Sequence, residues 1–516
     1  MAKSKPQRFI TELELEPTPG QAKKLLARFE AARQVYNACL GECLKRLGLL
    51  RQSRLYNHAR KMPKGDKRNA AFREANEKIG FHEYDITRWA TQFTKSWINQ
   101  HVGARSVEQI ASSTFKTTKQ HAFGKRGRPR FKRKGEMVTI EGKTGSDCRW
   151  KGKGIVWKKL TVAARIDPND RVVVHGLKAR VKYVRLTRRT VRGKEHFYAQ
   201  LVNEGLPFKK PEHVVAKGVV GLDLGPQTIA VVGESEAMLQ VFCGELENRQ
   251  NEIRIAQRAL DRRRRANNPD NYNDDGTIRK GPKKWTASNR QQNLQLRLSD
   301  LQRRQAAQRK NLHGQLVHRV IKMGNDIQME KLSYKAFQSQ FGKSVGFRAP
   351  GVFVSRLRAA AVKYGVTVTE FSTKTTKLSQ TCHQCGKILK KTLRQRWHLC
   401  DCGIAAQRDL YSAFLARFVR ENRLDAVQAQ KAWPGACALL DAALSLAKQQ
   451  YMEGAVPTSL GLRSAPGENL SRRNHVKKPA KTTDVVTIDF GGESRGEADE
   501  NREHTVIGWR RPPNDM

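Results

Sequence analysis

Four cysteines within residues 382–403 have the spacing of a metal site. They form a C-x2-C pair and a C-x-C pair, with fourteen residues between the pairs. Two pairs of thiolates on tight turns supply the four sulfur ligands that a tetrahedral zinc ion takes. Because four thiolates leave no coordination position for water or substrate, we expect the zinc to be structural. The predicted ligands are Cys382, Cys385, Cys400 and Cys402.

Asp223 is a carboxylate in the middle of an apolar segment, VVGLDLGPQTIAVV, residues 219–232. The segment is typical of a buried strand, and Gly225 allows a tight backbone turn after it. A carboxylate buried in such a strand must shift its pKa or find a partner. A divalent cation, held together with further carboxylates, is the partner that we expect.

Two further acids have comparable settings. Glu330 ends the segment NDIQME, which is typical of a short strand that follows a helix. Asp409 lies in AAQRDLYSAFLARF, at the start of a predicted helix. Three carboxylates on separate elements can hold two Mg²⁺ ions, an arrangement that activates water and stabilises the leaving oxygen in phosphodiester hydrolysis.

Each acid taken alone has a plainer interpretation. Any one of the three is compatible with a surface or helix-capping acid. For Asp409, N-capping of the helix that it starts is the favoured single-residue interpretation. The metal-site hypothesis therefore depends on the three acids meeting in space.

The segment GKRGRPRFKRKG, residues 124–135, holds seven basic residues among twelve. Glycines, a proline and Phe131 are interleaved with them. A run of this kind is often only a solvated surface, but in a chain this basic we expect contacts to nucleic-acid phosphates. The candidate nucleic-acid contacts are Lys125, Arg126, Arg128, Arg130, Lys132, Arg133 and Lys134.

The charge of the whole chain favours a polyanionic partner. The 516 residues include 98 Lys and Arg against 48 Asp and Glu, a formal net charge of +50. Such an excess repels itself unless a polyanion neutralises it, and nucleic acid does so with release of counterions. The composition is also compatible with a ribosomal-type or histone-like binder that carries no chemistry.

The sequence gives no sign of a membrane or secreted protein. It has no apolar run of about eighteen residues, so no transmembrane helix is predicted. The N-terminal segment MAKSKPQRFITELELEP is charged and lacks the apolar core of a secretory signal. Nine cysteines, four of them clustered, indicate a reducing compartment rather than a disulfide framework. We therefore expect a cytoplasmic protein with no membrane partner.

Hydrophobic periodicity predicts the elements that must position these residues. Residues 8–17 alternate as a strand does, and residues 18–122 carry helical spacing. Short alternating runs over residues 136–205 indicate antiparallel β structure, either a barrel or a sheet. From residue 219 onward strands alternate with helices, which indicates an α/β layer.

Several segments together resemble the TnpB proteins of insertion sequences and their descendants, the miniature type V CRISPR effectors. VVGLDLG resembles the first motif of their RuvC-type nuclease domain, DIQMEKLS the second and RDLYSA the third. KTTKLSQTCHQCGK is similar to the entry to their zinc ribbon, and GRPRFKRK and ARQVYNACL resemble two segments of their N-terminal half. The likeness keeps one consistent order over about residues 8–415.

The resemblance implies a multidomain α/β protein with an RNase H-like (RuvC) nuclease domain, an inserted zinc ribbon, a β-barrel wedge and a helical recognition lobe. It places Asp223, Glu330 and Asp409 as the catalytic acids and as ligands of two Mg²⁺ ions. It also implies a guide RNA and a double-stranded target DNA as partners, Mg-dependent cleavage of that DNA, and a prokaryotic, nucleoid-associated location.

The order of the motifs predicts the domain boundaries. The first wedge strand and the tail are the two ends of the chain, and the zinc ribbon interrupts the nuclease domain. The expected ranges are 1–17 for the first wedge strand, 18–122 for the helical lobe, 123–207 for the wedge β domain, 208–378 and 404–454 for the nuclease, 379–403 for the ribbon and 455–516 for the tail.

Two residues beside Asp409 depart from the third motif of the family. Gln407 stands where the first acid of that motif is usual, and Tyr411 stands where an asparagine is usual. If these changes spoil the metal geometry, the protein is an RNA-guided DNA-binding protein with weak or no cleavage, comparable to a repressor. A protein-only transposase or resolvase is the other alternative.

Overall fold

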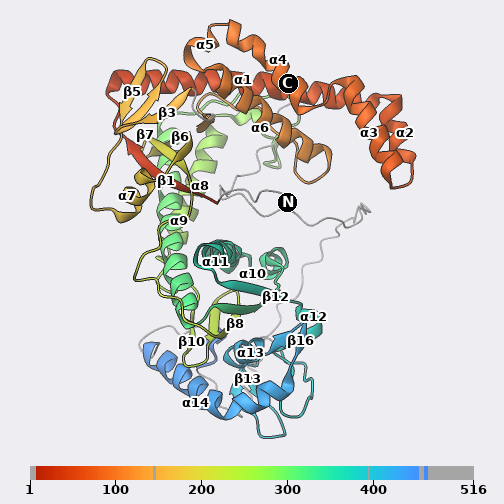
Figure 1. The fold of residues 1–516 in the computed structure, drawn as a ribbon, viewed down its shortest axis with the longest axis vertical. Helices are drawn as coiled ribbons and strands as arrows, with labels where there is room; N and C mark the ends of the chain where they lie inside the picture. The colour runs from red at the N-terminus through yellow and green to blue at the C-terminus, as the bar shows by residue number, and fades with distance from the viewer. Residues whose placement is uncertain (1–6, 143–146, 393, 452–457, 463–516) are drawn as a thin grey trace. The chain divides into compact units, whose positions relative to one another are not determined.

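The computed structural model describes residues 7–142, 147–392, 394–451 and 458–462. These residues divide into two compact units, one up to Phe208 and one from Lys209 onward. Figure 1 shows the elements of each unit. Unit 1 is built of long helices and antiparallel sheets, and unit 2 is built of one mixed sheet with helices on both faces.

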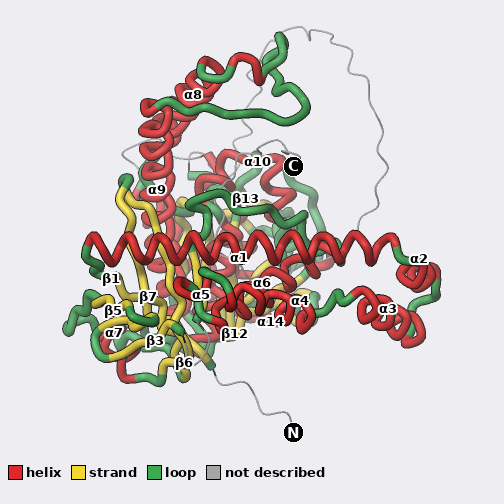
Figure 2. Tube along the Cα trace, turned by 90° about the horizontal axis from the view of Figure 1, so that it is seen from above, coloured by secondary structure: helices red, strands yellow, loops and turns green. Residues whose placement is uncertain are grey.

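The helices of unit 1 pack around α1, which spans Pro19–Gln52. Thr18 caps this helix in a capping box with Gln21, and Pro19 follows directly, so the start of the helix is strongly specified. Figure 2 shows α1 along its length, with α2 and α3 beyond one end. The other helices are α2 (Arg54–Lys61), α3 (Asp66–Ile79), α4 (Glu83–Ala90), α5 (Ile98–His101) and α6 (Ala104–Ala122).

The strands of unit 1 form two antiparallel sheets. One has the order β1-β7-β6-β2 and the other the order β3-β4-β5, and an isolated bridge between Leu15 and Ala164 joins them. The sequence left open a barrel or a sheet for this region, and the barrel stays a prediction. The strands are β1 (Arg8–Leu15), β2 (Thr139–Glu141), β3 (Cys148–Lys151), β4 (Gly154–Trp157), β5 (Leu160–Ala163), β6 (Val181–Val191) and β7 (Lys194–Glu204).

One segment predicted as β structure is a helix. Helix α7 spans Arg171–Lys178, although its sequence RVVVHGLK is rich in β-branched residues. The side chain of Asp170 caps it by accepting hydrogen bonds from the backbone N–H groups of Val172 and Val173. Here the cap and an amphipathic pattern outweigh the strand propensity of three valines.

The sheet of unit 2 has five strands in the order β10-β9-β8-β11-β12. The first three strands along the chain form an antiparallel meander, whereas β11 and β12 run parallel to β8. The strands are β8 (Val219–Leu224), β9 (Thr228–Val232), β10 (Ala237–Val241), β11 (Asp326–Glu330) and β12 (Thr367–Phe371).

Helices cover both faces of this sheet. On one face α9 (Asn289–Met323) and α11 (Pro350–Tyr364) enclose a core that includes Leu222 and Met329. On the other face α13 (Arg408–Ala416) and α14 (Ala426–Gln450) pack against β9 and β10. Figure 1 shows α11 and α13 on opposite sides of the sheet. The remaining elements are α8 (Gln250–Ala266), α10 (Tyr334–Arg348), α12 (Thr373–Thr376), β13 (Trp397–Leu399), β14 (Ala405–Gln407), β15 (Val419–Arg420) and β16 (Arg423–Leu424).

Part of the predicted tail belongs to this core. Residues 458–462 are described, and Leu460 among them is fully buried in the cluster beneath α13 and α14. Its carbonyl oxygen accepts a hydrogen bond from Gln407 at 3.2 Å. The rest of the predicted tail, from residue 463 onward, lies outside the described residues.

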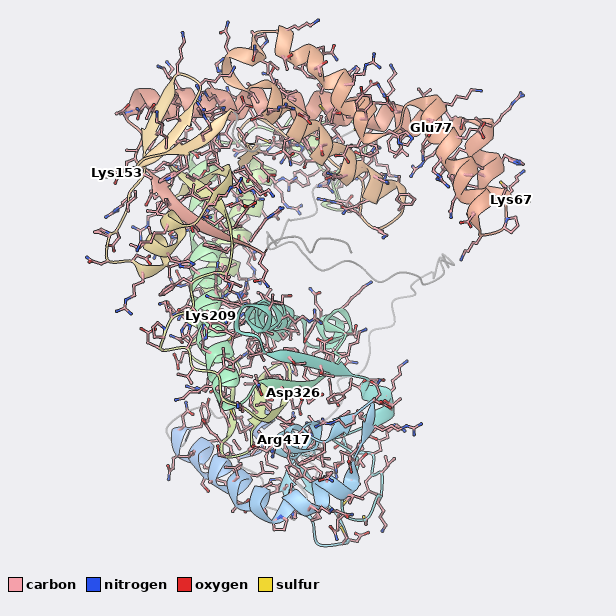
Figure 3. The ribbon with its side chains drawn as sticks, in the orientation of Figure 1. Lys67, Glu77, Lys153, Lys209, Asp326 and Arg417 are labelled. Atoms are coloured by element: carbon pink, nitrogen blue, oxygen red, sulfur yellow. The ribbon has the colours of Figure 1, made fainter. Side chains whose placement is uncertain are left out.

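Basic side chains reach solvent in both units. Lys67, Lys153 and Lys209 are exposed examples, labelled in Figure 3. In the described part of the chain no helix combines the length and the apolar character that a membrane span requires.

Candidate functional site

The strand register brings Asp223 and Glu330 side by side. In the parallel pair β8–β11, Leu222 is the partner of Met329, so the next residues along each strand are Asp223 and Glu330. Neighbouring strands lie about 4.8 Å apart, and successive side chains alternate between the two faces. Because Leu222 and Met329 point into the α9–α11 core, Asp223 and Glu330 both belong to the face that α13 covers.

Asp409 reaches the same region from the first turn of α13. Its Oδ2 accepts a hydrogen bond of 3.1 Å from the Thr228 hydroxyl, at the start of β9. Residues 225–228 form the tight turn between β8 and β9, closed by a bond from the Gly225 N–H to the Thr228 carbonyl. Asp409 is therefore held at the end of the strand that carries Asp223.

Gly221 allows α13 to lie directly on β8. A Cβ atom at this position would overlap the carbonyl oxygen of Ala413 in the middle of α13. The guanidinium of Arg417 fixes the far end of the helix by donating to the Val219 carbonyl at 3.1 Å. Since residue 221 lies on the same face as Asp223, the missing side chain sets the distance between the helix and the carboxylate.

The three acids share one electrostatic environment. Burial raises the pKa of Asp223 well above its ordinary value, and the charges of Asp409 and Glu330 raise it further. Burial also raises the pKa of Glu330, to about 7. Arg408 opposes the shift of the Asp223 pKa and contacts Asp409 at 3.4 Å. The group is thus rich in negative charge and short of positive charge, which is the setting that a divalent cation relieves.

The carboxylates do not form a closed cage for a single ion. Among the described residues, the four cysteines form a group whose ligand atoms all lie within 4.8 Å of one another. The three acids do not form such a group. Backbone register places Asp223 beside Glu330, and the hydrogen bond from Thr228 holds Asp409 at the same end of the sheet. The three acids belong to separate secondary-structure elements. Their carboxylate oxygens are ligands of the kind that Mg²⁺ prefers.

The four predicted zinc ligands do converge. The Sγ atoms of Cys382 and Cys402 lie 3.5 Å apart, and those of Cys385 and Cys400 lie 3.4 Å apart. Four sulfurs at the usual zinc distance would be separated by about 3.8 Å, so the cluster fits a tetrahedral ion. A backbone hydrogen bond from residue 402 lowers the pKa of Cys400 to about 7, which favours the thiolate.

Glycines shape both cysteine turns. Gly386 and Gly403 follow the two pairs and have φ of 70° and 92°, in the left-handed region that favours glycine. Their N–H groups donate to the carbonyls of Cys382 and Cys400 at 3.0 Å each. The strands β13 and β14 then pair as a short hairpin that leads directly into α13.

The two departures from the third motif have structural roles. Gln407 is the N-cap of α13: its Oε1 accepts from the Leu410 N–H at 2.7 Å. Asp409 is therefore not the helix cap, and the single-residue interpretation of Asp409 was wrong. Tyr411 is fully buried, and its hydroxyl contacts His383 in the cysteine-bearing hairpin.

The basic segment 124–135 is fastened to α1 at one residue. The Lys132 carbonyl accepts from Arg33 and Asn37, each at 2.9 Å, and the Lys132 N–H donates to Asn37 at 2.8 Å. The Lys132 ammonium lies 5.1 Å from the ring centre of Tyr36, and burial lowers its pKa. Lys132 is thus an anchor, while the other six candidate contacts are exposed.

These contacts explain two motifs that the sequence could only place separately. ARQVYNACL lies on α1 and GRPRFKRK lies on the basic segment, and Arg33, Tyr36 and Asn37 of the first hold the second. The signal in the sequence was an asparagine and an arginine four residues apart on one helix face, but nothing indicated what they bind.

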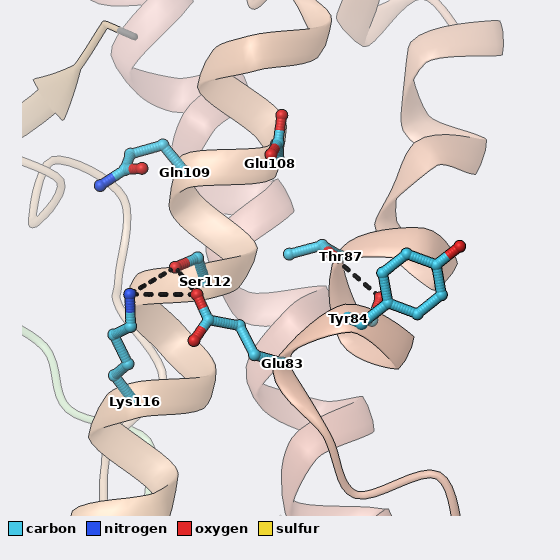
Figure 4. A pocket seen from close by; sticks show the side chains of 7 residues that line it. All are labelled: Glu83, Tyr84, Thr87, Glu108, Gln109, Ser112 and Lys116. Carbon is cyan, nitrogen blue, oxygen red and sulfur yellow. Dashed lines mark hydrogen bonds and ion pairs between the residues drawn. The ribbon is translucent and has the colours of Figure 1, made fainter.

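A pocket of about 430 Å³ lies between α4 and α6 in unit 1 (Figure 4). Its charged side chains are already paired: Glu83 accepts from Ser112 at 2.5 Å and lies 3.0 Å from Lys116. None of the three candidate acids lines it, so it is separate from the carboxylate site.

Comparisons with known proteins identify two segments. Residues 351–415 match the family model described as Cas12f1-like, TNB domain, and span α11, β12, the ribbon and most of α13. Residues 11–48 match a helix-turn-helix domain model of the OrfB proteins of IS605 elements. Both matches bear out the resemblance to TnpB and the miniature type V effectors. No curated protein matches the chain.

Two solved structures are similar over much of the chain. The cryo-EM structure of the Cas12f1–sgRNA–target DNA complex covers 79% of this chain and 98% of that chain, with 12% identity and a TM-score of 0.41. The cryo-EM structure of the CRISPR-Cas12f ternary complex covers 76% and 81%, with 12% identity and a TM-score of 0.27.

Replacing Gly221 by alanine should destabilise unit 2. The added methyl group must push α13 off β8, and overpacking of this kind costs about 1–3 kcal/mol. The change is measured as a lower denaturant midpoint of unit 2. Gly435→Ala is the matched control, because a Cβ there meets nothing within 4 Å and the residue lies inside α14. Equal midpoints for Gly221→Ala and the wild type would show that the close approach is not needed.

Replacing Cys385 by serine should remove the zinc. Elemental analysis of the purified wild-type protein should give one zinc per chain, and the variant should give nearly none because a structural site needs all four thiolates. Cys437→Ser is the control, since Cys437 lies outside the cluster. Zinc retained in full by Cys385→Ser would contradict the assignment.

Proposed function

The chain resembles the TnpB and miniature type V CRISPR effector superfamily at two matched segments, and from this premise we propose that it is an RNA-guided DNA endonuclease. In this proposal one RuvC-like site, Asp223, Glu330 and Asp409, hydrolyses the target DNA. The observation that carries it is the placement of the three acids at one end of the sheet, where burial first, and then the charges of Asp409 and Glu330, raise the pKa of Asp223.

The sheet of unit 2 supports an RNase H-like assignment. Three antiparallel strands followed by two parallel ones, in the order β10-β9-β8-β11-β12, place the first acid on the central strand. Glu330 ends the neighbouring parallel strand, at the carboxyl edge where open α/β sheets bind their ligands. Asp409 then joins them from a helix on the same face.

The three acids are the residues that would hold Mg²⁺, as two ions. When bound, Mg²⁺ supplies activation of the attacking water and stabilisation of the departing 3′ oxygen. The neighbouring residues of the chain position the carboxylates that would bind these ions. Thr228 orients the Asp409 carboxylate by donating to Oδ2, and Arg408 balances part of the negative charge before any cation arrives. The helix contact over Gly221 keeps Asp409 close to Asp223.

The charge of the chain supports a large nucleic-acid partner. A net charge of +50 suits a protein that holds a structured guide RNA and a double-stranded target. In such systems base pairing reads the sequence, and the protein supplies basic surfaces for the heteroduplex and the single strand. The exposed residues Lys125, Arg126, Arg128, Arg130, Arg133 and Lys134 are the proposed phosphate contacts.

The parts of the chain have proposed roles. Residues 18–122 serve as the recognition lobe, residues 1–17 and 123–207 as the wedge, and residues 208–378 with 404–454 as the nuclease. The ribbon, residues 379–403, serves as a structural zinc module within the nuclease. The four converging cysteine sulfurs support this role.

A second candidate function is RNA-guided DNA binding without effective cleavage. Gln407 favours it, because this residue replaces an acid of the family motif and its amide is engaged in capping α13 and in a bond to Leu460. In that case the target is bound and stays intact.

The cleavage test uses protein purified with its own RNA. Sequencing that RNA supplies the guide, and a matched double-stranded DNA is then incubated with the complex and Mg²⁺. Wild-type protein should cut the DNA, and Asp223→Asn should cut at least about 1,000-fold more slowly while it binds RNA equally well. Tight binding of uncut DNA by the wild type would favour the repressor alternative. Cutting that survives RNase treatment would instead indicate a protein-only transposase or resolvase.

The Mg²⁺ requirement of cleavage should depend on pH. Glu330 has a pKa raised to about 7, so protons compete with Mg²⁺ for its carboxylate below that pH. The Mg²⁺ concentration that gives half-maximal cleavage should therefore fall as pH rises through about 7 and level off above about 8. Measuring single-turnover rates across Mg²⁺ concentrations at several pH values checks this. A Mg²⁺ requirement that is constant between about pH 6 and 8 would rule out competition at this residue.

A further inference from the structure

Tyr411 links the zinc ribbon to the helix that carries Asp409. It lies two residues after Asp409 on α13, so the two side chains leave the helix about 200° apart. Asp409 contacts Thr228 of the sheet, while Tyr411 is fully buried on the opposite side, against the ribbon. One helix turn thus connects the carboxylate site to the metal module.

The hydroxyl of Tyr411 binds the first cysteine turn at two points. It accepts a hydrogen bond of 3.1 Å from the backbone N–H of His383, the residue that directly follows Cys382. The same hydroxyl lies 2.7 Å from Nδ1 of the His383 ring. The hydroxyl thus contacts both the backbone and the side chain of His383.

The aromatic ring of Tyr411 contacts the second half of the ribbon. The ring of His398 lies 4.2 Å from it, centre to centre, and tilted by 32°. His398 is fully buried on β13, two residues before Cys400. Tyr411 therefore touches both halves of the hairpin that brings the two thiolate pairs together.

A second helix supports the same cysteine turn without reaching the carboxylates. Gln430 of α14 donates to the carbonyls of His383 and Gln384 at 3.0 and 3.1 Å. The His383 ring also packs on Trp433 at 4.9 Å. The turn is thus held by α13 through Tyr411 and by α14 through Gln430, and only the first of these helices carries an acid of the proposed site.

We propose that Tyr411 is a positioning residue that couples zinc binding in the ribbon to the placement of Asp409. Zinc fixes the cysteine turns, the turns fix Tyr411 through His383 and His398, and Tyr411 fixes the first turn of α13. The asparagine that the family motif favours is shorter and lacks a ring to pack against His398. The coupling to catalysis rests on the proposed function, whereas the coupling between zinc and α13 does not.

The first test removes the hydroxyl and follows zinc. In Tyr411→Phe the His383 N–H and Nδ1 lose their partner, and loss of such an outer-shell contact weakens metal binding by roughly tenfold or more. We expect zinc release to a coloured chelator to be about tenfold faster than in the wild type. Tyr451→Phe is the matched control: Tyr451 packs on the same core, and its hydroxyl accepts from the Val241 N–H, away from the ribbon. Release at the wild-type rate in Tyr411→Phe overturns the proposal.

The second test measures α13 directly by hydrogen exchange. In the wild type, removing zinc should speed exchange of the amides in residues 408–416. In zinc-loaded Tyr411→Phe those amides should already exchange faster, whereas Tyr451→Phe should match the wild type there. If zinc removal leaves exchange in α13 unchanged in the wild type, the coupling does not exist and the proposal fails.

The catalytic consequence has its own measurement. In zinc-loaded, RNA-bound protein, Tyr411→Phe should lower the single-turnover cleavage rate about tenfold without changing the affinity for target DNA. Tyr451→Phe, whose lost hydroxyl contact to Val241 lies away from the ribbon, should keep the wild-type rate. If the wild type cuts DNA and Tyr411→Phe cuts it at the same rate, the proposal is overturned. A wild type that does not cut at all refutes the proposed function, and the zinc and exchange tests still decide the coupling.

Discussion

The gathering of three carboxylates at one end of the sheet is the constraint on which the packing around α13 depends. Asp223 and Glu330 lie side by side by strand register, and Asp409 joins them from α13. Desolvation raises the pKa of Asp223 most, and the like charges of Asp409 and Glu330 raise it further. Arg408 opposes the shift of Asp223 only in part, and a bound cation would favour the charged form of the three acids.

Several contacts hold Asp409 near Asp223 and Glu330, although the like charges of the three acids repel one another. Gly221 removes the side chain that would separate α13 from β8, and Arg417 ties the end of the helix to the same strand. Gln407 caps the helix start, and Tyr411 fixes its outer face to the ribbon. The residues that depart from the family motif are therefore part of the support of the site.

Composition and spacing predicted the parts of the structure that have local causes. Cysteine pairs followed by glycines are a local signal of a metal site. The spacing from Cys382 to Cys402 therefore predicted the cluster. An acid in an apolar strand is an anomaly that a sequence shows plainly, which is why Asp223 stood out. The helix α7 was not predicted because three valines favour a strand, and the cap at Asp170 together with an amphipathic pattern outweighs that preference.

Long-range contacts could not be predicted in the same way. No local pattern shows that Gly221 meets Ala413, nearly two hundred residues later, or that Asn37 holds Lys132. Tyr411 looked like a defect in a catalytic motif, since its partners His383 and His398 lie in another element and are identified only by the fold. The roles of side chains that act through such long-range contacts are identified only from the folded structure.

Binding of Mn²⁺ to the nucleic-acid-free protein would show whether Asp223, Glu330 and Asp409 form a cation site. Mn²⁺ replaces Mg²⁺ at oxygen sites and is counted by electron paramagnetic resonance, with no need for guide or target. The account predicts saturable Mn²⁺ binding to the wild type that is lost in Asp223→Asn, while the zinc content of the variant stays at one per chain. Equal Mn²⁺ binding by the two proteins would contradict the account, because the three acids would then not form a cation site.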